Sequence, residues 1–401
     1  MNVAGISAPW IGLLRDIEKA TCFPQCPPDG FDPLRASDDE LKDFSLPPKP
    51  DKSRFPVRYV FWRKMFTRPC ACTPVVRFIP ARFEYEAVEG GQKPAKSEDG
   101  EVEVSQQRAT LKYEDEVEVG LQRSRHHRRS ARRVHETSLN WAGASITSGG
   151  GRMFTEVHAS WRVPVVALPP SAQQMLSEKE GDEFRCSSWI GLDGQRRYVN
   201  ASLPQIGTSH FVKIVNNKPK MTDGVWWQWW LAGGPNPPPI KLPLKVNPGD
   251  EMMASLFVVA ERHVKYLIAN HTTGEVCTPF IEPIPTTYLE PLQTGHPRPR
   301  RHDWPARVSG ATAEWITERP MNWTTGEMDQ LPAFQPVIFR DCHVVSGRAP
   351  GKDEREELPA GAQLINASRI ESNPFRSVQV AVAERLCRDS FSTNFVGEPM
   401  T

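Results

Sequence analysis

Apolar and polar residues alternate with a period of two along most of the chain after Leu139. This alternation is typical of strands that bury one face, and turn-forming residues such as Pro164 and Gly207 separate the segments. Many short strands at regular spacing predict an all-β fold, either an antiparallel β-sandwich or a barrel. The clearest alternating segments are residues 154–163, 254–259, 264–268 and 378–382.

The first 89 residues have a different pattern and predict a separate accessory region or pro-region. Ser37 is followed by three acidic residues in the arrangement of a helix capping box, so we expect a short helix there that ends before Pro47. A second short helix is expected around residues 10–19. Residues 57–62 and 75–79 are rich in β-branched and aromatic side chains and predict strands.

Charges of opposite sign are segregated in residues 90–137, with acidic residues over 98–118 and basic residues over 123–133. Blocks of this kind with few large apolar residues usually stay unfolded, so we expect a disordered linker. The alternative is a pro-segment with basic cleavage sites ahead of a mature domain at 138–401. A nucleic-acid-binding arm is disfavoured because no aromatic residues interleave the arginines.

The composition agrees with a loop-rich β protein and excludes several classes. The chain has 401 residues, 38 of them proline, and its formal net charge is +1. A charge so close to zero gives no general attraction to nucleic acid or to a membrane surface. The sequence contains no apolar run of about 18 residues, so no transmembrane helix is predicted. The first residues lack the features of a signal peptide.

Eight cysteines are too sparse to define a disulfide scaffold. Cys22 with Cys26, and Cys70 with Cys72, have the short spacing of half a zinc site, but no second pair follows at a zinc-finger spacing. We therefore expect no metal.

Six short motifs occur in the same order as in one known family. They are residues 140–144 (NWAGA), 161–164 (WRVP), 189–194 (WIGLDG), 205–207 (QIG), 227–229 (WQW) and 313–316 (AEWI). From about residue 139 to its end, the chain resembles the eqolisins, the fungal glutamic peptidases. The resemblance implies a sandwich of two antiparallel seven-stranded sheets and proteolysis by a glutamine and a glutamate, here Gln205 and Glu314.

The two side chains have the chemical groups that peptide hydrolysis requires. Hydrolysis of a peptide bond without a metal or a nucleophilic side chain requires a base for water and a donor for the developing oxyanion. Glu314 can supply the base and Gln205 two N–H donors that do not titrate. Because an ordinary glutamate ionises near pH 4.3, the pair predicts an acid-acting endopeptidase. Taken singly, Glu314 is more simply a solvated strand residue and Gln205 a turn residue.

The resemblance also implies substrate-binding positions on the concave face of one sheet. By motif these are Trp141, Trp189, Asp193, Gly194, Trp227 and Trp229. In the run from Trp226 to Trp230, alternation should place one pair of tryptophans in the core and the other pair on the concave face. The simpler interpretation is that most of these rings fill the core.

Two departures from the family pattern keep other functions open. Gln228 stands where members usually have glutamate, and the interval from Asp193 to Gln205, twelve residues, is longer than expected. The alternatives are a catalytically inactive homologue and a β-sandwich that binds carbohydrate or peptide. The peptidase interpretation implies polypeptide substrates, no cofactor, a monomer and secretion.

Overall fold

The computed structural model describes most of the chain and divides it into two units. One comprises Met1–Arg82 with His135–Thr401, and the other is Phe83–Val134. The predicted linker at 90–137 lies outside the described residues as far as Val134, as do residues 75–78 of a predicted strand. The described residues are 15, 17–71, 79–80, 135–174, 176, 181–195, 202–230, 239–281, 287–289, 301–303, 307–321, 328–370 and 377–397.

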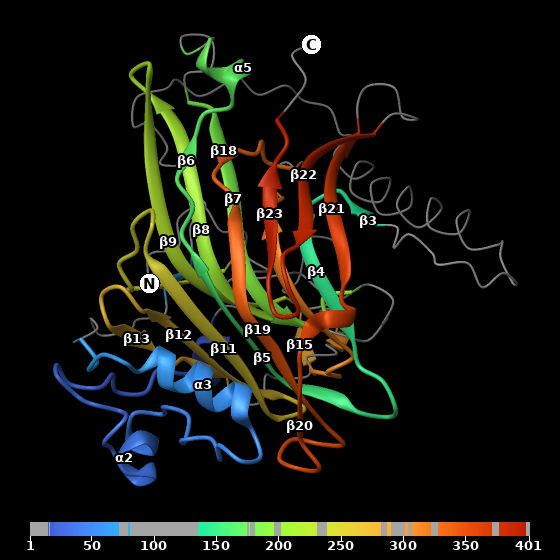
Figure 1. Cartoon of the computed structure of the whole chain (residues 1–401). Coiled ribbons are helices and arrows are strands. Elements are labelled where there is room, and N and C mark those ends of the chain that lie inside the picture. Colours follow the sequence, from blue (N-terminus) through green and yellow to red (C-terminus); the bar gives the residue numbers. More distant parts are fainter. Residues whose placement is uncertain are drawn as a thin grey trace, which may run out of the picture. The chain divides into compact units, whose positions relative to one another are not determined.

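Antiparallel strands dominate the first unit, which confirms the predicted all-β sandwich (Figure 1). Strand β19 takes part in both layers, so hydrogen bonds join them into one continuous sheet. The first layer runs in the order β10 (Ile240–Leu242), β9 (Lys218–Trp230), β8 (Leu203–Val215), β7 (Glu183–Leu192), β17 (Thr312–Glu318), β4 (Trp141–Thr147), β21 (Gln363–Ile370), β22 (Ser377–Arg385), β23 (Phe391–Phe395) and β19 (Val337–Gly347).

The second layer continues from β19 through β5, β11 and β12. Its strands are β20 (Arg355–Glu357), β19, β5 (Met153–Arg162), β11 (Glu251–Ala260), β12 (His263–Asn270), β13 (Glu275–Cys277), β14 (Phe280–Ile281) and β1 (Thr21–Cys22). The remaining short elements are β2 (Ile79–Pro80), β3 (Glu136–Ser138), β6 (Val166–Ala167), β15 (Thr287–Leu289), β16 (Arg301–Asp303), β18 (Ala333–Phe334), α5 (Pro170–Gln173) and the 3₁₀ helix η1 (Pro359–Gly361).

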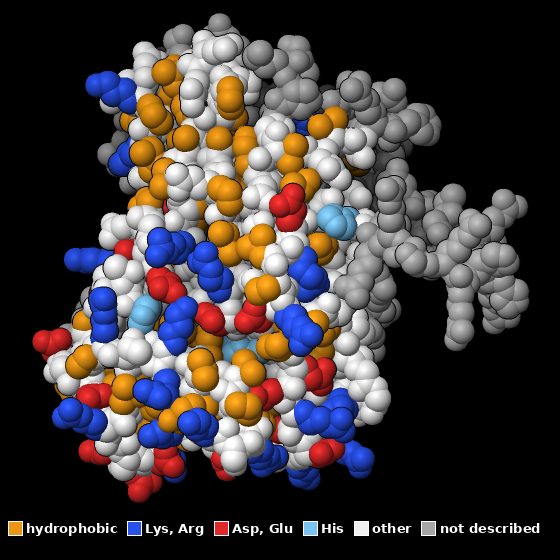
Figure 2. Space-filling view, in the orientation of Figure 1, with side chains coloured by type: hydrophobic (Ala, Val, Ile, Leu, Met, Phe, Trp, Pro, Cys, Tyr) orange, Lys and Arg blue, Asp and Glu red, His pale blue; other side chains and the backbone are white. Residues whose placement is uncertain are grey.

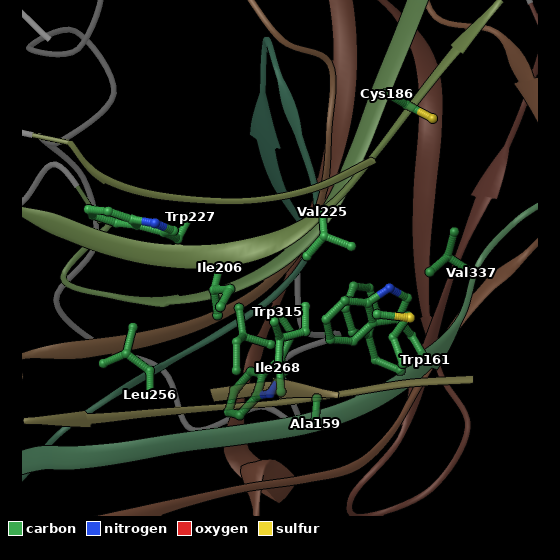
Figure 3. Close-up of a cluster of buried hydrophobic side chains, with 14 of the residues drawn as sticks. Ala159, Trp161, Cys186, Ile206, Val225, Trp227, Leu256, Ile268, Trp315 and Val337 are labelled. Atoms are coloured by element: carbon green, nitrogen blue, oxygen red, sulfur yellow. The ribbon is translucent and has the colours of Figure 1, made fainter. Parts of the chain in front are cut away.

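The main core lies between the layers and takes alternate residues of each strand (Figure 3). Trp161, Trp227 and Trp315 come from β5, β9 and β17, and each is at most 1% exposed. Two of their indole N–H groups have buried partners: that of Trp161 donates to the Thr208 hydroxyl at 3.1 Å, and that of Trp315 to the carbonyl of His158 at 2.9 Å. These bonds remove the penalty of burying an indole and fix the rings in place.

The N-terminal region confirms one sequence prediction and corrects another. Helix α2 (Asp38–Asp43) begins at a complete capping box between Ser37 and Glu40, as predicted. Residues 57–62, predicted as a strand, instead belong to helix α3 (Pro56–Met65). Proline at the first helical position favours a helix start, and packing of Phe61, Trp62 and Met65 overrides the β propensity of the segment.

Helix α3 packs on the outer face of the second layer. Its buried side chains contact residues of β11 and β12 in a cluster separate from the main core. At its start, the backbone N–H groups of Val57 and Arg58 donate to the carboxylate of Glu356 at 3.1 and 2.6 Å. A carboxylate at this end of a helix satisfies free N–H groups and complements the helix dipole. No helix among the described residues is long and apolar enough to cross a membrane.

A buried polar cluster lies beneath α3. Arg58 pairs with Glu156 at 2.8 Å, and Glu156 contacts Nε2 of His158 at 2.9 Å. The other imidazole nitrogen of His158 lies 2.8 Å from the Ser255 hydroxyl, and the ring stacks on His343 at 4.3 Å. Burial, followed by the charge of Arg58, holds the pKa of His158 well below its usual value. Burial likewise lowers the pKa of His343 to about 3, so both rings are neutral.

This cluster predicts a loss of stability in acid. A histidine in the unfolded chain binds a proton near pH 6.5, whereas folded His343 does so only near pH 3. The contribution of His343 to the free energy of unfolding is complete above pH 6.5. It decreases as the pH falls towards 3, by roughly 3 kcal/mol between pH 7 and pH 4. Urea unfolding should therefore show a smaller pH-dependent loss in His343→Gln than in the wild type. Equal losses in the two proteins would contradict this account.

Candidate active site

The two predicted catalytic residues lie in one row across the first layer. Glu314 of β17 pairs with Gly191 of β7, Gly191 pairs with Gln205 of β8, and Gln205 pairs with Gln228 of β9. Residues directly opposite in antiparallel strands share a face of the sheet. Since neighbouring strands are about 4.8 Å apart, the backbones of Glu314 and Gln205 are separated by two strand spacings, about 10 Å.

Gly191 keeps the position between the glutamate and the glutamine free of a side chain. A Cβ atom there would lie 2.7 Å from Cδ1 of Leu203 and 3.0 Å from the carbonyl oxygen of Pro204. Both neighbours belong to the beginning of β8, just ahead of Gln205. Any larger residue at position 191 would therefore displace the segment that carries the glutamine.

Glu314 is a buried carboxyl group in an unusual state. Its side chain is fully buried, and neither carboxylate oxygen has a partner of normal hydrogen-bond geometry among the described residues. Burial raises the pKa of Glu314 to about 8, and the charge of Asp193 adds to the rise. The Thr312 hydroxyl and the backbone N–H groups of Gly194 and Gln195 partly offset it. The group is therefore mostly protonated at neutral pH, unlike the ordinary glutamate assumed from sequence.

The side chain of Gln205 is held by one hydrogen bond and can form further hydrogen bonds. Its Nε2 donates to Oε1 of Gln228 at 2.7 Å. Its Oε1 is buried without a described partner. A carboxamide nitrogen carries two hydrogens, so the bond to Gln228 leaves a second N–H. Gln228, noted from sequence only as a departure, thus orients the amide of Gln205.

Asp193, which the resemblance predicts to bind substrate, anchors the segment that leads into β17. Its carboxylate accepts bonds from the backbone N–H groups of Ser309, Gly310 and Ala311 at 2.6, 3.0 and 2.7 Å, and from the Ser309 hydroxyl at 2.8 Å. Its own N–H donates to the carbonyl of Thr312 at 2.9 Å. These bonds fix the start of the strand that carries Glu314.

The four tryptophans of β9 divide between the two faces, but not as assigned from the motifs. Trp227 and Trp229 point into the main core, each 1% exposed, so the structure does not bring them to the face with Gln205 and Glu314. Trp226 and Trp230 lie on that face. Alternation predicts one pair of tryptophans on each face, but nothing in the strand itself identifies the buried side, so the assignment of Trp227 and Trp229 to the substrate face is wrong.

Trp141, Trp189 and Gly194, also predicted to bind substrate, do lie near Glu314. Trp141 and Trp189 pack edge to face, with ring centroids 5.2 Å apart. A Cβ atom on Gly194 would lie 2.6 Å from Cη2 of Trp141 and 3.3 Å from Cδ of Glu314. The absent side chain of Gly194 thus allows the indole edge and the carboxyl group to approach each other.

Sequence reasoning missed three residues on this face as site residues. Leu203 and Trp226 belong to an apolar cluster with Trp189. Glu318 accepts hydrogen bonds from the indole N–H groups of Trp141 and Trp189. Its position, four residues after Glu314 in an alternating strand, already put it on the same face.

In the part of the chain that is described, no group of three or more His, Cys, Asp or Glu side chains is arranged to hold a metal ion. What the site does offer is a carboxyl group and a carboxamide on one face, separated by a glycine. The first can exchange a proton with water, and the second can donate to an oxyanion.

Comparison with known proteins identifies relatives for the larger part of the chain. The family model described as "Peptidase A4 family" matches residues 139–384. No curated protein sequence matches.

Three solved peptidase structures are similar to part of this chain. A scytalido-glutamic peptidase bound to a transition-state analogue inhibitor has 17% identity and a TM-score of 0.44, with 64% of this chain and 98% of that chain covered. SCP-B, an eqolisin in complex with the tripeptide Ala-Ile-His, has 18% identity and a TM-score of 0.42, with 64% of this chain and 98% of that chain covered. Aspergilloglutamic peptidase from Aspergillus niger has 16% identity and a TM-score of 0.37, over 53% and 99%.

The absence of a side chain at Gly191 should matter for both stability and cleavage. Gly191→Ala should destabilise the protein by about 1 to 3 kcal/mol, as overpacking does, and should also reduce peptide cleavage because β8 is displaced near Gln205. Gly224→Ala on β9 is the matched control, since a Cβ atom there meets only the Ser209 hydroxyl, at 3.5 Å. Urea unfolding and peptide cleavage measure the two effects. Equal behaviour of the two variants would show that the space at Gly191 is not needed.

Proposed function

Because the chain belongs to the peptidase A4 family, the eqolisins, we propose that this glutamic endopeptidase hydrolyses peptide bonds with Glu314 and Gln205. The supporting observation is the cross-strand row in which these two residues flank Gly191 on one face of the sheet. Both side chains are buried; Oε1 of Gln205 has no described partner, and the carboxyl oxygens of Glu314 have none of normal hydrogen-bond geometry. Buried polar atoms left without partners are uncommon, and a substrate and a water molecule would supply them here.

Glu314 acts as the proton-transfer group. In its ionised form it removes a proton from water while that water attacks the carbonyl carbon of the peptide. It then gives the proton to the leaving amine, which restores the carboxylate and releases two peptides. A carboxyl group with a raised pKa is a stronger base when ionised than an ordinary glutamate.

Gln205 stabilises the charge that develops on the carbonyl oxygen. The Nε2 hydrogen that is not bonded to Gln228 donates to this oxygen in the tetrahedral intermediate. Because a carboxamide does not titrate, this donor is available at every pH at which the protein is folded. Gln228 holds the amide in place before the substrate binds.

The apolar rings beside the pair form the substrate face in this proposal. Trp141, Trp189, Trp226 and Trp230 lie on the same side of the sheet as Glu314. Indole rings bind side chains of an extended peptide through large apolar contacts. The proposed substrate is therefore a polypeptide, and Trp227 and Trp229 serve the core instead.

The raised pKa of Glu314 revises the acid optimum expected from sequence. That expectation used the ionisation of a solvated glutamate near pH 4.3. With a pKa of about 8, Glu314 is almost entirely protonated in acid, and the fraction able to act as a base grows as the pH rises. We therefore propose activity that increases towards neutral and mildly alkaline pH.

Substitution of either residue tests the assignment. Glu314→Gln should reduce cleavage of a denatured protein substrate to a small residual rate, because an amide is far too weak a base to take the proton of water. Gln205→Ala should reduce kcat by about 100- to 1000-fold, the usual effect of losing one oxyanion donor. Pepstatin, an inhibitor of aspartic peptidases, is included to exclude a contaminant. Wild-type activity in a folded Glu314→Gln variant would refute the proposed base.

The dependence of kcat/KM on pH tests the state of the carboxyl group. This parameter reports ionisations of the free enzyme, so its ascending limb should have an apparent pKa of about 8. Initial rates on one fluorogenic peptide over pH 3 to 9 would measure it. A limb centred near the ordinary value for glutamate would instead mean that Glu314 is solvated in the active protein.

A further inference from the structure

Glu318 accepts hydrogen bonds from the indole N–H groups of two tryptophans on the proposed substrate face. Its Oε2 accepts the indole N–H of Trp189 at 2.8 Å, and its Oε1 accepts that of Trp141 at 3.3 Å. Oε1 also accepts Nδ2 of Asn140 at 3.1 Å. Both carboxylate oxygens are thereby occupied by donors from β7, from β4 and from the residue before β4. The described reaction uses none of these bonds.

We propose that Glu318 is a positioning residue, which fixes the indole rings of Trp141 and Trp189 beside Glu314 and so determines how tightly a peptide substrate binds. This inference rests on the proposed peptidase function for its kinetic consequence. The bonds themselves are independent of that function and can be tested without it.

A carboxylate suits this task better than any other side chain of similar size. The indole nitrogen is a donor only, so each ring needs an acceptor, and one ionised carboxylate offers two oxygens that accept and do not donate. Trp189 is fully buried, which makes an unpaired indole N–H costly there. The two rings also meet edge to face at 5.2 Å, so fixing one helps to fix the other.

The position of the Trp141 ring affects the space around Glu314. The edge of this ring and the carboxyl carbon of Glu314 both border the point where a Gly194 Cβ would lie, at 2.6 and 3.3 Å. Glu318 holds the nitrogen of the same indole. A rotation of the ring after loss of that bond would therefore fill or open the space beside Glu314.

The anchor should respond to pH. Burial raises the pKa of Glu318 to about 7, and the three N–H donors from Trp189, Trp141 and Asn140 oppose the rise. Protonation of Glu318 removes part of the capacity of its carboxyl group to accept hydrogen bonds. The two indole rings are therefore held less firmly below about pH 7. Glu314 is the other titratable group on the same strand face, and Arg319, the next residue, donates to the backbone carbonyl of Asp329 instead.

Kinetics of Glu318→Gln provide the first test. The amide keeps one acceptor oxygen but presents an NH₂ group to a second donor, so KM should rise about tenfold, the effect of losing one hydrogen bond to a charged group. The kcat value should change less than about threefold, because no proton is transferred at this site. Glu183→Gln is the matched control: Glu183 is a partly buried carboxylate of the same sheet that accepts from Arg185 at 2.9 Å, and its loss should leave both constants unchanged.

Tryptophan fluorescence of the full chain supplies a second test that does not require activity. Emission of the wild type should change with a midpoint near pH 7, and this transition should be absent from Glu318→Gln. Trp141→Phe and Trp189→Phe, which keep a ring but remove the donor, should each reduce it. If the protein shows no peptidase activity but the transition behaves in this way, the anchor stands and the proposed function fails.

Other results would overturn the proposal. A Glu318→Gln variant with unchanged KM and an unchanged fluorescence transition would show that the carboxylate does not fix the rings. A loss of thermal stability alone, with both readouts intact, would assign Glu318 a merely structural role. Should Glu318→Gln fail to fold, the two Trp→Phe variants decide: a normal KM and a normal transition in both would refute the anchor.

Discussion

The register of β17 between β4 and β7 determines most of what this protein can do. Trp315 enters the core, where its indole donates to the carbonyl of His158, and this fixes which face the neighbouring residues occupy. Glu314 and Glu318 must then both lie on the opposite face. A slip of one residue would exchange the faces and move both carboxyl groups into the main core between the layers, so the core and the site depend on the same alignment.

Burial gives the site its chemical character. A carboxyl group taken out of water resists ionisation, and Glu314 has no ion-pair partner among the described residues to compensate for this. Stability alone would favour an apolar residue there, as it would for any buried polar group without partners. Two further residues shape the same site. Asp193 binds the backbone of the segment that enters β17, and Gly191 leaves space for β8 just ahead of Gln205.

The sequence predicted the sandwich and singled out Gln205 and Glu314, which the structure places in one cross-strand row, but it did not predict the environment of these two side chains. Alternation identified the strands, and the motifs singled out Gln205 and Glu314. Alternation cannot tell which side of a strand faces the core, so Trp227 and Trp229 were assigned to the wrong face. The helix at Pro56–Met65 was missed because its β-branched and aromatic residues have strand propensity, and only their packing against β11 and β12 makes the segment helical. Burial, and with it the raised pKa of Glu314, depends on contacts between segments far apart in the chain.

In the proposed mechanism, Glu314 and Gln205 act together on one substrate carbonyl and one water. A double-mutant cycle on the full chain, using kcat/KM for a single peptide, tests it most directly. Residues that act as a unit are not additive, so adding Gln205→Ala to Glu314→Gln should reduce the residual rate little further. If the second substitution instead lowers the rate by the full factor it causes alone, the two residues act independently, and the cross-strand row is not the catalytic unit.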